Sequence, residues 1–216
     1  MNHKLAFLLF LLSFSGTLSF AQKPFSEGII IYKVKLESPD NTNEVSGTYT
    51  FVIKGNEVKK EIKLNNGYQD VVLLNGGNHK VYSLQNLNNR KYAIELNMNE
   101  MTKKQEKFAG YTIKNEQINS KNIAGYAVCK GNINYKDGSG ADIYYTKEWR
   151  PVQTITFERF PDAKFLPMSF SYKEDNGMVM QFDIEKIEPG PVENAVFRIP
   201  PDYKMVSYSE YMQLSK

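Results

Sequence analysis

Short segments in which apolar and polar residues alternate fill most of the chain, and turn residues separate them. The clearest pair runs from Pro167 to Ile187, "PMSFSYKEDNGMVMQFDIEKI". On both sides of the central Asp175-Asn176-Gly177, every second residue is apolar and the residues between are mostly polar. A period of two gives a strand one apolar face and one solvated face. The pattern therefore predicts antiparallel sheet with one face buried.

The length of the loop in this hairpin follows from matching its two apolar faces. A two-residue loop would set Tyr172 against Gln181, and a four-residue loop would place it opposite Val179, on the wrong face. A three-residue loop, residues 175–177, agrees with both strands and gives its glycine the left-handed position. The predicted pairs are Tyr172 with Met180, Phe170 with Phe182, and Met168 with Ile184.

The apolar face of this hairpin is the candidate ligand-binding surface. Methionine is flexible and polarisable, and it recurs on surfaces that accept varied apolar partners. The same face could equally fill an ordinary core, because one side of any antiparallel sheet must be buried. The candidate residues are Met168, Phe170, Tyr172, Met178, Met180, Phe182 and Ile184.

Further β segments are expected along the rest of the chain. A turn at Gly55-Asn56 is predicted to pair Ile53 with Val58 and Tyr49 with Ile62, and a two-residue turn at Asn66-Gly67 to pair Ile62 with Val71. The expected segments are Glu27–Glu37, Gly47–Lys54, Glu57–Leu64, Val71–Leu74, His79–Leu84, Lys91–Asn97, Tyr111–Ile118, Gly125–Tyr135, Ala141–Trp149 and Thr154–Phe160.

Two segments depart from the β pattern and predict short helices. Asn99–Gly110 contains good helix formers and ends in a glycine that would stop a helix. Met101, Gln105 and Phe108 would share one side of it. A second helix is expected from Ser207, where Tyr208, Tyr211 and Met212 follow helical spacing. The predicted fold is mainly β, with α+β character: antiparallel sheet with one to three short helices.

The first 21 residues have the form of a secretory signal peptide. Lys4 precedes the apolar run Leu5–Leu12, and Ser19-Phe20-Ala21 has the small-x-small form of a cleavage site. The run is short for a transmembrane helix, which needs about 20 apolar residues; an uncleaved anchor is the alternative. No cysteine follows the cleavage site, so a lipoprotein is not expected. We expect an exported, periplasmic protein whose mature chain begins at Gln22.

Composition narrows the class of the mature protein. Residues 22–216 suit a single domain with a sizeable core. The leader contains one lysine and no acidic residue, so its removal lowers the net charge from +3 to +2 and gives no reason to expect nucleic acid. Cys129 is the single cysteine, which leaves no intrachain disulfide. Its alternating surroundings favour a small buried hydrophobe over a reactive thiol.

No recognisable catalytic or metal-binding constellation is present in the sequence. His79 is the one histidine after the leader, and a zinc site normally takes several His or Cys ligands. "DGSGAD", around Ser139, has the glycine spacing of a hairpin turn, and no G-x-S-x-G elbow, P-loop or G-x-G-x-x-G occurs. A Cys129–His79 pair remains an open alternative. We expect neither an enzyme nor a cofactor.

The order of segments resembles a known family. A leader is followed by Gly28-x-Ile30-x-Tyr32, a long meander with a short helix, then "FERFPDAKFLPMSF" and "VENAVFRIPPDYKMV". The pattern is similar to that of an uncharacterised family of Gram-negative periplasmic proteins in the superfamily of the LolA/LolB lipoprotein carriers. It covers nearly the whole mature chain. Its most specific elements are Phe160, Leu166-Pro167, Phe197-x-Ile199-Pro200 and Tyr203.

This resemblance implies a strongly curved antiparallel sheet, a half-open barrel, whose concave, apolar side is capped by one to three short helices and carries acyl chains. The helix at residues 99–108 would then be a lid, and the partner a lipid or the acyl chain of a lipoprotein. An arginine inside the cavity matters for gating in the lipoprotein carrier, and no position here matches it. The alternative is an envelope protein–protein interaction module whose core is filled by its own side chains. A monomer is expected in either case.

Overall fold

The computed structural model describes residues 22–38, 44–152, 157–174 and 176–214. The expected leader, Asp175 and residues 153–156 lie outside these ranges. These ranges contain two helices, two 3-10 turns and fourteen strands. The helical elements are α2 (Met98–Gln105), η2 (Glu106–Phe108), η4 (Asn194–Phe197) and α3 (Tyr208–Leu214). The strands are β1 (Lys23–Phe25), β2 (Glu27–Glu37), β3 (Val45–Lys54), β4 (Glu57–Leu64), β5 (Gln69–Asn75), β6 (Lys80–Leu87), β7 (Arg90–Leu96), β8 (Thr112–Ile123), β9 (Tyr126–Asn134), β10 (Gly140–Thr146), β11 (Trp149–Pro151), β12 (Leu166–Lys173), β13 (Val179–Pro189) and β14 (Lys204–Ser207).

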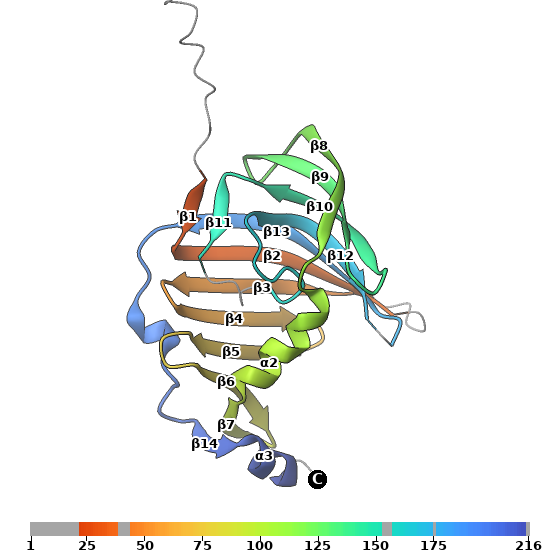
Figure 1. The fold of residues 1–216 in the computed structure, drawn as a ribbon. Helices are drawn as coiled ribbons and strands as arrows, with labels where there is room; N and C mark the ends of the chain where they lie inside the picture. The colour runs from red at the N-terminus through yellow and green to blue at the C-terminus, as the bar shows by residue number, and fades with distance from the viewer. Residues whose placement is uncertain (1–21, 39–43, 153–156, 175, 215–216) are drawn as a thin grey trace, which may run out of the picture.

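Twelve strands form one curved sheet in the order β14-β7-β6-β5-β4-β3-β2-β13-β12-β10-β9-β8. Neighbouring strands are antiparallel except β7 and β14, and β1 and β11 make a separate parallel pair. The two edge strands, β8 and β14, do not pair, so the sheet is not closed into a barrel. Figure 1 shows β8–β10 bending away at one end of the sheet and α2 crossing in front of its middle strands. The predicted fold class is confirmed.

Bulges and close backbone contacts help to bend the sheet. The register shifts between Ile184 and Lys186 on β13 and between Tyr144 and Tyr145 on β10. Such bulges increase local twist and bend the strand that carries them. At Gly28, φ is +146°, and a Cβ would overlap the Glu188 carbonyl oxygen. A Cβ on Gly47 would overlap the carbonyl of Lys63, so both glycines permit close strand packing.

The main core lies on the concave face, where the alternation of β2 places Ile30, Tyr32 and Val34. The Tyr32 hydroxyl is buried there and donates to the Pro167 carbonyl at 2.8 Å. A smaller cluster of Val71, Leu73, Leu84 and Ala93 lies on the opposite face. Residues Ile199 and Tyr203, from the segment before β14, pack against this second cluster. Both sides of the sheet's β5–β7 end therefore bury apolar side chains.

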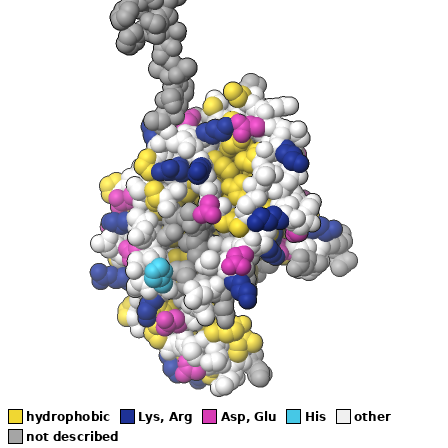
Figure 2. Space-filling view, viewed as in Figure 1, with side chains coloured by type: hydrophobic (Ala, Val, Ile, Leu, Met, Phe, Trp, Pro, Cys, Tyr) yellow, Lys and Arg dark blue, Asp and Glu magenta, His cyan; other side chains and the backbone are white. Residues whose placement is uncertain are grey.

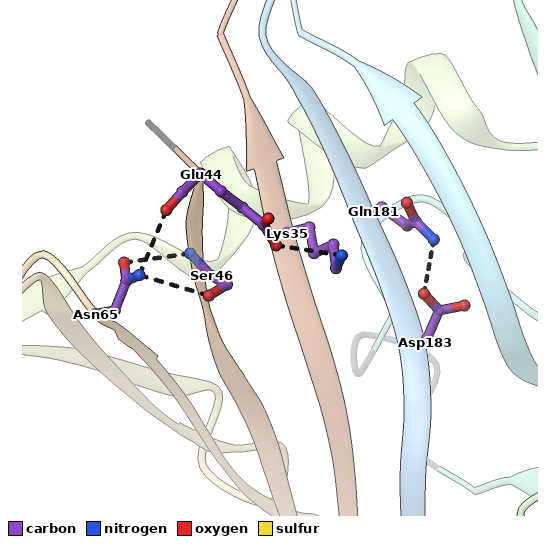
Figure 3. A network of polar contacts seen from close by, with 6 residues as sticks. All are labelled: Lys35, Glu44, Ser46, Asn65, Gln181 and Asp183. Atoms are coloured by element: carbon purple, nitrogen blue, oxygen red, sulfur yellow. Dashed lines mark hydrogen bonds and ion pairs between the residues drawn. The ribbon is translucent and has the colours of Figure 1, made fainter. Parts of the chain in front are cut away.

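The outer face of β2, β3 and β13 is polar instead (Figure 3). Lys35 pairs with Glu44 at 3.2 Å, and the Gln181 amide donates to Asp183 at 2.7 Å. The Asn65 amide oxygen accepts from the backbone N–H of Ser46 at 3.2 Å. These strands therefore have one apolar and one solvated face, as their sequences predict.

Most predicted registers are confirmed. Ile53 pairs with Val58 and Tyr49 with Ile62. In the hairpin of β12 and β13, Tyr172 pairs with Met180 and Phe170 with Phe182, while the Gly177 N–H donates to the Glu174 carbonyl at 2.9 Å. Gly177 has a φ of +85°, the left-handed conformation expected for its loop. The helix predicted from Asn99 is α2 and η2, and Gly110 ends it with a φ of +68°.

The turn at Asn66-Gly67 was predicted one residue too short. The Leu64 N–H donates to the Tyr68 carbonyl and the Gly67 N–H to the Leu64 carbonyl, which closes a three-residue loop. Gly67, with a φ of +87°, takes the left-handed position of this loop. Ile62 consequently pairs with Asp70 and not with Val71. The shift of one residue turns Asp70 to the concave face.

The strand predicted over Thr154–Phe160 is wrong for its described part. The Phe160 N–H donates to the Phe157 carbonyl, so these residues form a turn. Both phenylalanines are buried in the main core, because the turn brings their side chains to the same side. Polar and apolar residues alternate in this segment, but its described part forms a turn and not a strand.

Candidate functional site: a cavity on the concave face

A cavity of about 680 Å³ lies between the concave face of the sheet and the α2–η2 segment. Strands β2, β3, β7, β12 and β13 supply its sheet side, and the turn at 157–160 supplies a side wall. In Figure 2, hydrophobic side chains gather in a hollow above the position of α2, with Lys and Arg side chains near it. The lining residues are Tyr32, Tyr49, Phe51, Leu96, Met101, Lys103, Gln105, Lys107, Phe108, Phe157, Glu158, Arg159, Phe160, Phe170, Tyr172, Glu174 and Phe182.

Aromatic rings form much of the sheet side of the cavity. The rings of Phe170 and Phe182 stack with centroids 4.9 Å apart, and Tyr172 stacks on Phe182 at 5.6 Å. Tyr49 and Phe51 continue this surface on β3, with centroids 4.4 Å apart. Stacked and edge-on rings at these separations add to the stability that their burial provides. The surface is therefore a fixed wall of apolar ring faces.

The structure divides the seven candidate residues between the cavity and the core. Phe170, Tyr172 and Phe182 line the cavity. Met168 and Ile184 are buried in the main core, and Met180 packs against it, so their side chains do not line the cavity. Met178, the residue before β13, does not line it either. The strand period predicted which of these side chains share a face, but it could not show which part of that face remains uncovered.

The α2–η2 segment covers the cavity. The Asn97 side chain caps the helix by accepting from the Asn99 N–H at 2.9 Å. Met101, Gln105 and Phe108, predicted to share one side of the helix, all line the cavity. The Phe108 ring packs edge-on against Tyr135 at 5.2 Å, which anchors the C-terminal end of this segment to β9 and its turn.

Arg159 joins this cover to the sheet. Its guanidinium carbon lies 4.4 Å from the Phe108 ring centroid and 3.9 Å from that of Tyr172. The same guanidinium pairs with the Glu174 carboxylate at 2.9 Å. Sequence reasoning missed Arg159 because residues 154–160 were read as a strand. An arginine therefore lines the cavity, although no motif in the sequence identified it.

Lys60 introduces a buried charge on the concave face. Its side chain is 4% exposed, and its Nζ lies 3.5 Å from the Glu158 carboxylate and 5.9 Å from the Phe51 ring centroid. Burial lowers the pKa of Lys60, and the Glu158 carboxylate opposes that shift. The pairing of Tyr49 with Ile62 and Phe51 with Lys60 places this lysine beside the aromatic wall.

Asp70 lies on the same face, two strands from the aromatic wall. Its carboxylate accepts from the Gln85 amide at 2.6 Å and from the Ser83 hydroxyl at 3.4 Å. Burial raises the pKa of Asp70, and these hydrogen bonds oppose the shift. The concave face therefore changes from aromatic on β2, β3, β12 and β13 to partly polar on β4–β6.

The remaining candidates for chemistry are not brought together. Cys129 is half-buried against the main core on β9, and burial raises the pKa of its thiol. His79 lies in the turn between β5 and β6, and six strands separate β5 from β9, which contains Cys129. The two residues are therefore far apart in the sheet. Trp149 packs against Phe25 and Tyr126 and does not line the cavity. Across the described ranges, no three His, Cys, Asp or Glu side chains are placed to hold a metal ion.

Within the same ranges, no helix combines the length and apolar character needed to cross a bilayer. A scan of protein-family models finds no match to the chain, and a search of curated proteins also finds none.

Comparison with solved structures does return matches of low identity. A LolA superfamily protein from Nitrosomonas europaea is 13% identical, with a TM-score of 0.42 over 82% of this chain and 92% of that one. A domain from Vibrio parahaemolyticus, described as an outer membrane lipoprotein-sorting protein domain, is 9% identical, with a TM-score of 0.33 over 82% and 91%. A DUF1329 family protein from Desulfovibrio piger is 10% identical, with a TM-score of 0.38 over 80% and 90%.

The superfamily named in the first of these matches is the one that the sequence resembles. At these identities and TM-scores the matches carry no information about a ligand. The case for a ligand rests on the cavity itself.

Proposed function

We propose that the protein binds one apolar chain, such as the acyl chain of a lipid or lipoprotein, in this cavity and leaves its covalent bonds unchanged. The observation that carries the proposal is the unfilled volume of about 680 Å³ against a wall of aromatic rings. Small-ligand pockets usually measure about 300–1,000 Å³ and are lined mostly by apolar and aromatic side chains. The cavity has the size and lining of such a site.

The free energy of transferring an apolar chain into the cavity suits a protein that takes up and releases its ligand. Burying a methylene group is worth about 0.8 kcal/mol relative to water, so eight of them contribute about 6 kcal/mol before ordering costs. Relative to the interior of a membrane the gain is close to zero, because both environments are apolar. A carrier or sensor in the periplasm, where the leader is expected to direct this chain, would exchange such a ligand with little net driving force.

The rival function is an interaction module with a self-filled core. Part of the concave face is indeed filled by its own side chains, since Met168, Ile184 and Tyr32 are buried there. A cavity nevertheless remains beside them, under α2 and η2. The unfilled volume favours ligand binding over the rival.

Two measurements on the full-length mature protein test the proposal. Native mass spectrometry of protein extracted from cells should show an added mass that organic solvent removes. The delipidated protein should then bind the neutral dye N-phenyl-1-naphthylamine with saturable fluorescence, and fatty acids should displace it. A protein that carries no added mass and ignores the dye would refute ligand binding and leave the interaction module.

A further inference from the structure

We infer that the ligand of this cavity carries an anionic oxygen head group, a carboxylate or a phosphate, which lies at the lid formed by α2 and η2. The inference rests on the proposed function and narrows it. It concerns the end of the cavity where Lys103, Gln105 and Lys107 line the wall.

Most of the polar residues around the cavity come from the lid and the adjoining turn, which also contribute Met101, Phe108, Phe157 and Phe160. The sheet contributes mainly the rings of Tyr32, Tyr49, Phe51, Phe170 and Phe182. The lid and the adjoining turn contribute Lys103, Gln105, Lys107, Glu158 and Arg159. An amphipathic molecule with one apolar chain matches this division if its chain lies on the rings and its head lies under the lid.

Gln105 offers a hydrogen-bond donor that the protein does not use. The residue is 9% exposed and lines the cavity, and its amide nitrogen has no hydrogen-bond partner among the described residues. Buried amide groups are nearly always hydrogen-bonded, and an unsatisfied one is costly. The nitrogen atom is itself buried. Rotation of the amide by half a turn exchanges the positions of its nitrogen and oxygen. The donor can therefore be presented to an acceptor oxygen inside the cavity.

The charges at the lid select the sign of the head group. Of the two carboxylates that line the cavity, Glu158 pairs with Lys60 and Glu174 pairs with Arg159. Among the side chains that the structure describes, Lys103 and Lys107 form no ion pair with a carboxylate. The pKa of Asp137 is lowered mainly by hydrogen bonds from Ser139 and in smaller part by the Lys107 charge. The Lys107 ammonium lies 4.9 Å from the Phe108 ring centroid, at the inner side of the lid. Two cations at the lid, neither of them in an ion pair with a described carboxylate, favour an anion over a neutral or cationic head.

A set of ligands with one chain and different heads tests the inference. Dodecanoate, dodecyl phosphate, dodecanol and dodecyltrimethylammonium would each displace N-phenyl-1-naphthylamine from the full-length mature protein. We expect the anions to bind about tenfold more tightly than the alcohol at low salt, and the cation least tightly. Added salt should reduce this preference, because the lysines are exposed. A preference between the two anions identifies a free fatty acid or a phosphorylated lipid as the source.

Variants of lid residues test whether the preference for anionic ligands arises at the lid. Gln105→Met should lower the affinity for both anions about tenfold, and the double change Lys103→Gln with Lys107→Gln should remove the salt dependence. Dodecanol affinity should fall less than anion affinity in each variant, and dodecanol binding that is retained reports that the cavity is intact. The matched control is Lys33→Gln with Lys35→Gln, which removes two exposed lysines from the outer face of β2.

The outcomes separate the inference from the function on which it rests. If the dye and dodecanol bind as tightly as the anions do, ligand binding stands and the anionic head is refuted. The same conclusion follows if the anion preference survives in both lid variants. If neither the dye nor any of the four ligands binds, the proposed function fails and the inference fails with it.

Discussion

Phe170 and Phe182 stack across the β12–β13 ladder, with ring centroids 4.9 Å apart and ring planes 11° from parallel. Phe182 is 3% exposed and belongs to the main core, yet it also lines the cavity. The ring therefore supports the fold and also bounds the site. A charge at this position would be buried without a partner whether or not the cavity holds a ligand. Phe182→Asp consequently cannot distinguish a carrier from a filled core.

Truncation of the Phe182 side chain measures its contribution to the free energy of unfolding. Phe182→Ala should lower the free energy of unfolding by about 3–5 kcal/mol, because it removes a buried ring and leaves a void beside the cavity. Tyr68→Ala, at a residue that is 53% exposed, is the control and should change it by about 0.5 kcal/mol or less. Denaturant titration of both variants checks this. Equal losses would mean that Phe182 is not part of the core.

Filling the cavity separates binding from folding. Met101 and Leu96 are half-buried and line it from the lid and from β7. Either Met101→Trp or Leu96→Trp should weaken binding of N-phenyl-1-naphthylamine about tenfold or more, since the larger side chain occupies the site. The free energy of unfolding should fall by no more than about 1 kcal/mol, because empty space accepts the added atoms.

The control for these variants is Met205→Trp, at a residue that is 49% exposed on β14 and does not line the cavity. Its dye affinity should equal that of the unaltered protein. Dye binding that survives in both cavity variants would place the binding site elsewhere.

Two glycines with almost the same backbone conformation test how the strands pack. Gly28 and Gly190 have φ values of +146° and +154°. A Cβ at Gly28 would overlap the Glu188 carbonyl oxygen, whereas a Cβ at Gly190 would meet open space. Backbone strain is therefore similar in Gly28→Ala and Gly190→Ala, and the difference between them isolates the steric overlap. We expect Gly28→Ala to be less stable by about 2 kcal/mol in chemical unfolding. Equal stabilities would show that β2 and β13 separate freely.

Local patterns in the sequence predicted the strands, the β12–β13 register and the lid helix because each depends on neighbouring residues. The loop of Asn66 and Gly67 was misjudged because both loop lengths satisfy local preferences. The two differ only in whether Asp70 or Val71 faces Ile62, and the correct choice places a carboxylate on the concave face beside Ser83 and Gln85.

The cavity residues that the sequence did not reveal come from contacts between distant segments. Arg159 lies between Phe108 of the lid and Tyr172 of β12, and no periodicity links these three positions. Lys60 occupies an inward position in a strand that reads as mostly charged. Which part of the concave face stays open depends on where Met168 and Ile184 pack. That is a property of the assembled core and not of any segment.

The buried Lys60 should contribute to the free energy of unfolding a term that rises with pH, opposite in sign to the term from the buried tyrosines, whose pKa values burial raises. Burial lowers the pKa of Lys60 in the folded protein below the ordinary 10.5, and the Glu158 carboxylate opposes part of that shift. The unfolded chain therefore binds this proton more tightly than the folded one. Between the lowered pKa and 10.5 the unfolded state binds more protons. The free energy of unfolding must therefore rise with pH through that window and stay level with respect to this group below it.

Lys60→Met removes this contribution. Relative to the unaltered protein, the free energy of unfolding of this variant should lack the term that rises with pH, and its stability at neutral pH should be equal to or greater than that of the unaltered protein. The second expectation follows because Glu158 is 58% exposed and is not left buried without its partner. Lys63→Met, at a lysine that is 57% exposed, is the control and should keep that term. Denaturant midpoints measured between pH 7 and 10.5 decide the matter. If Lys60→Met and the unaltered protein respond to pH alike, the Lys60 ammonium is solvated, and the polar part of the concave face is open to water.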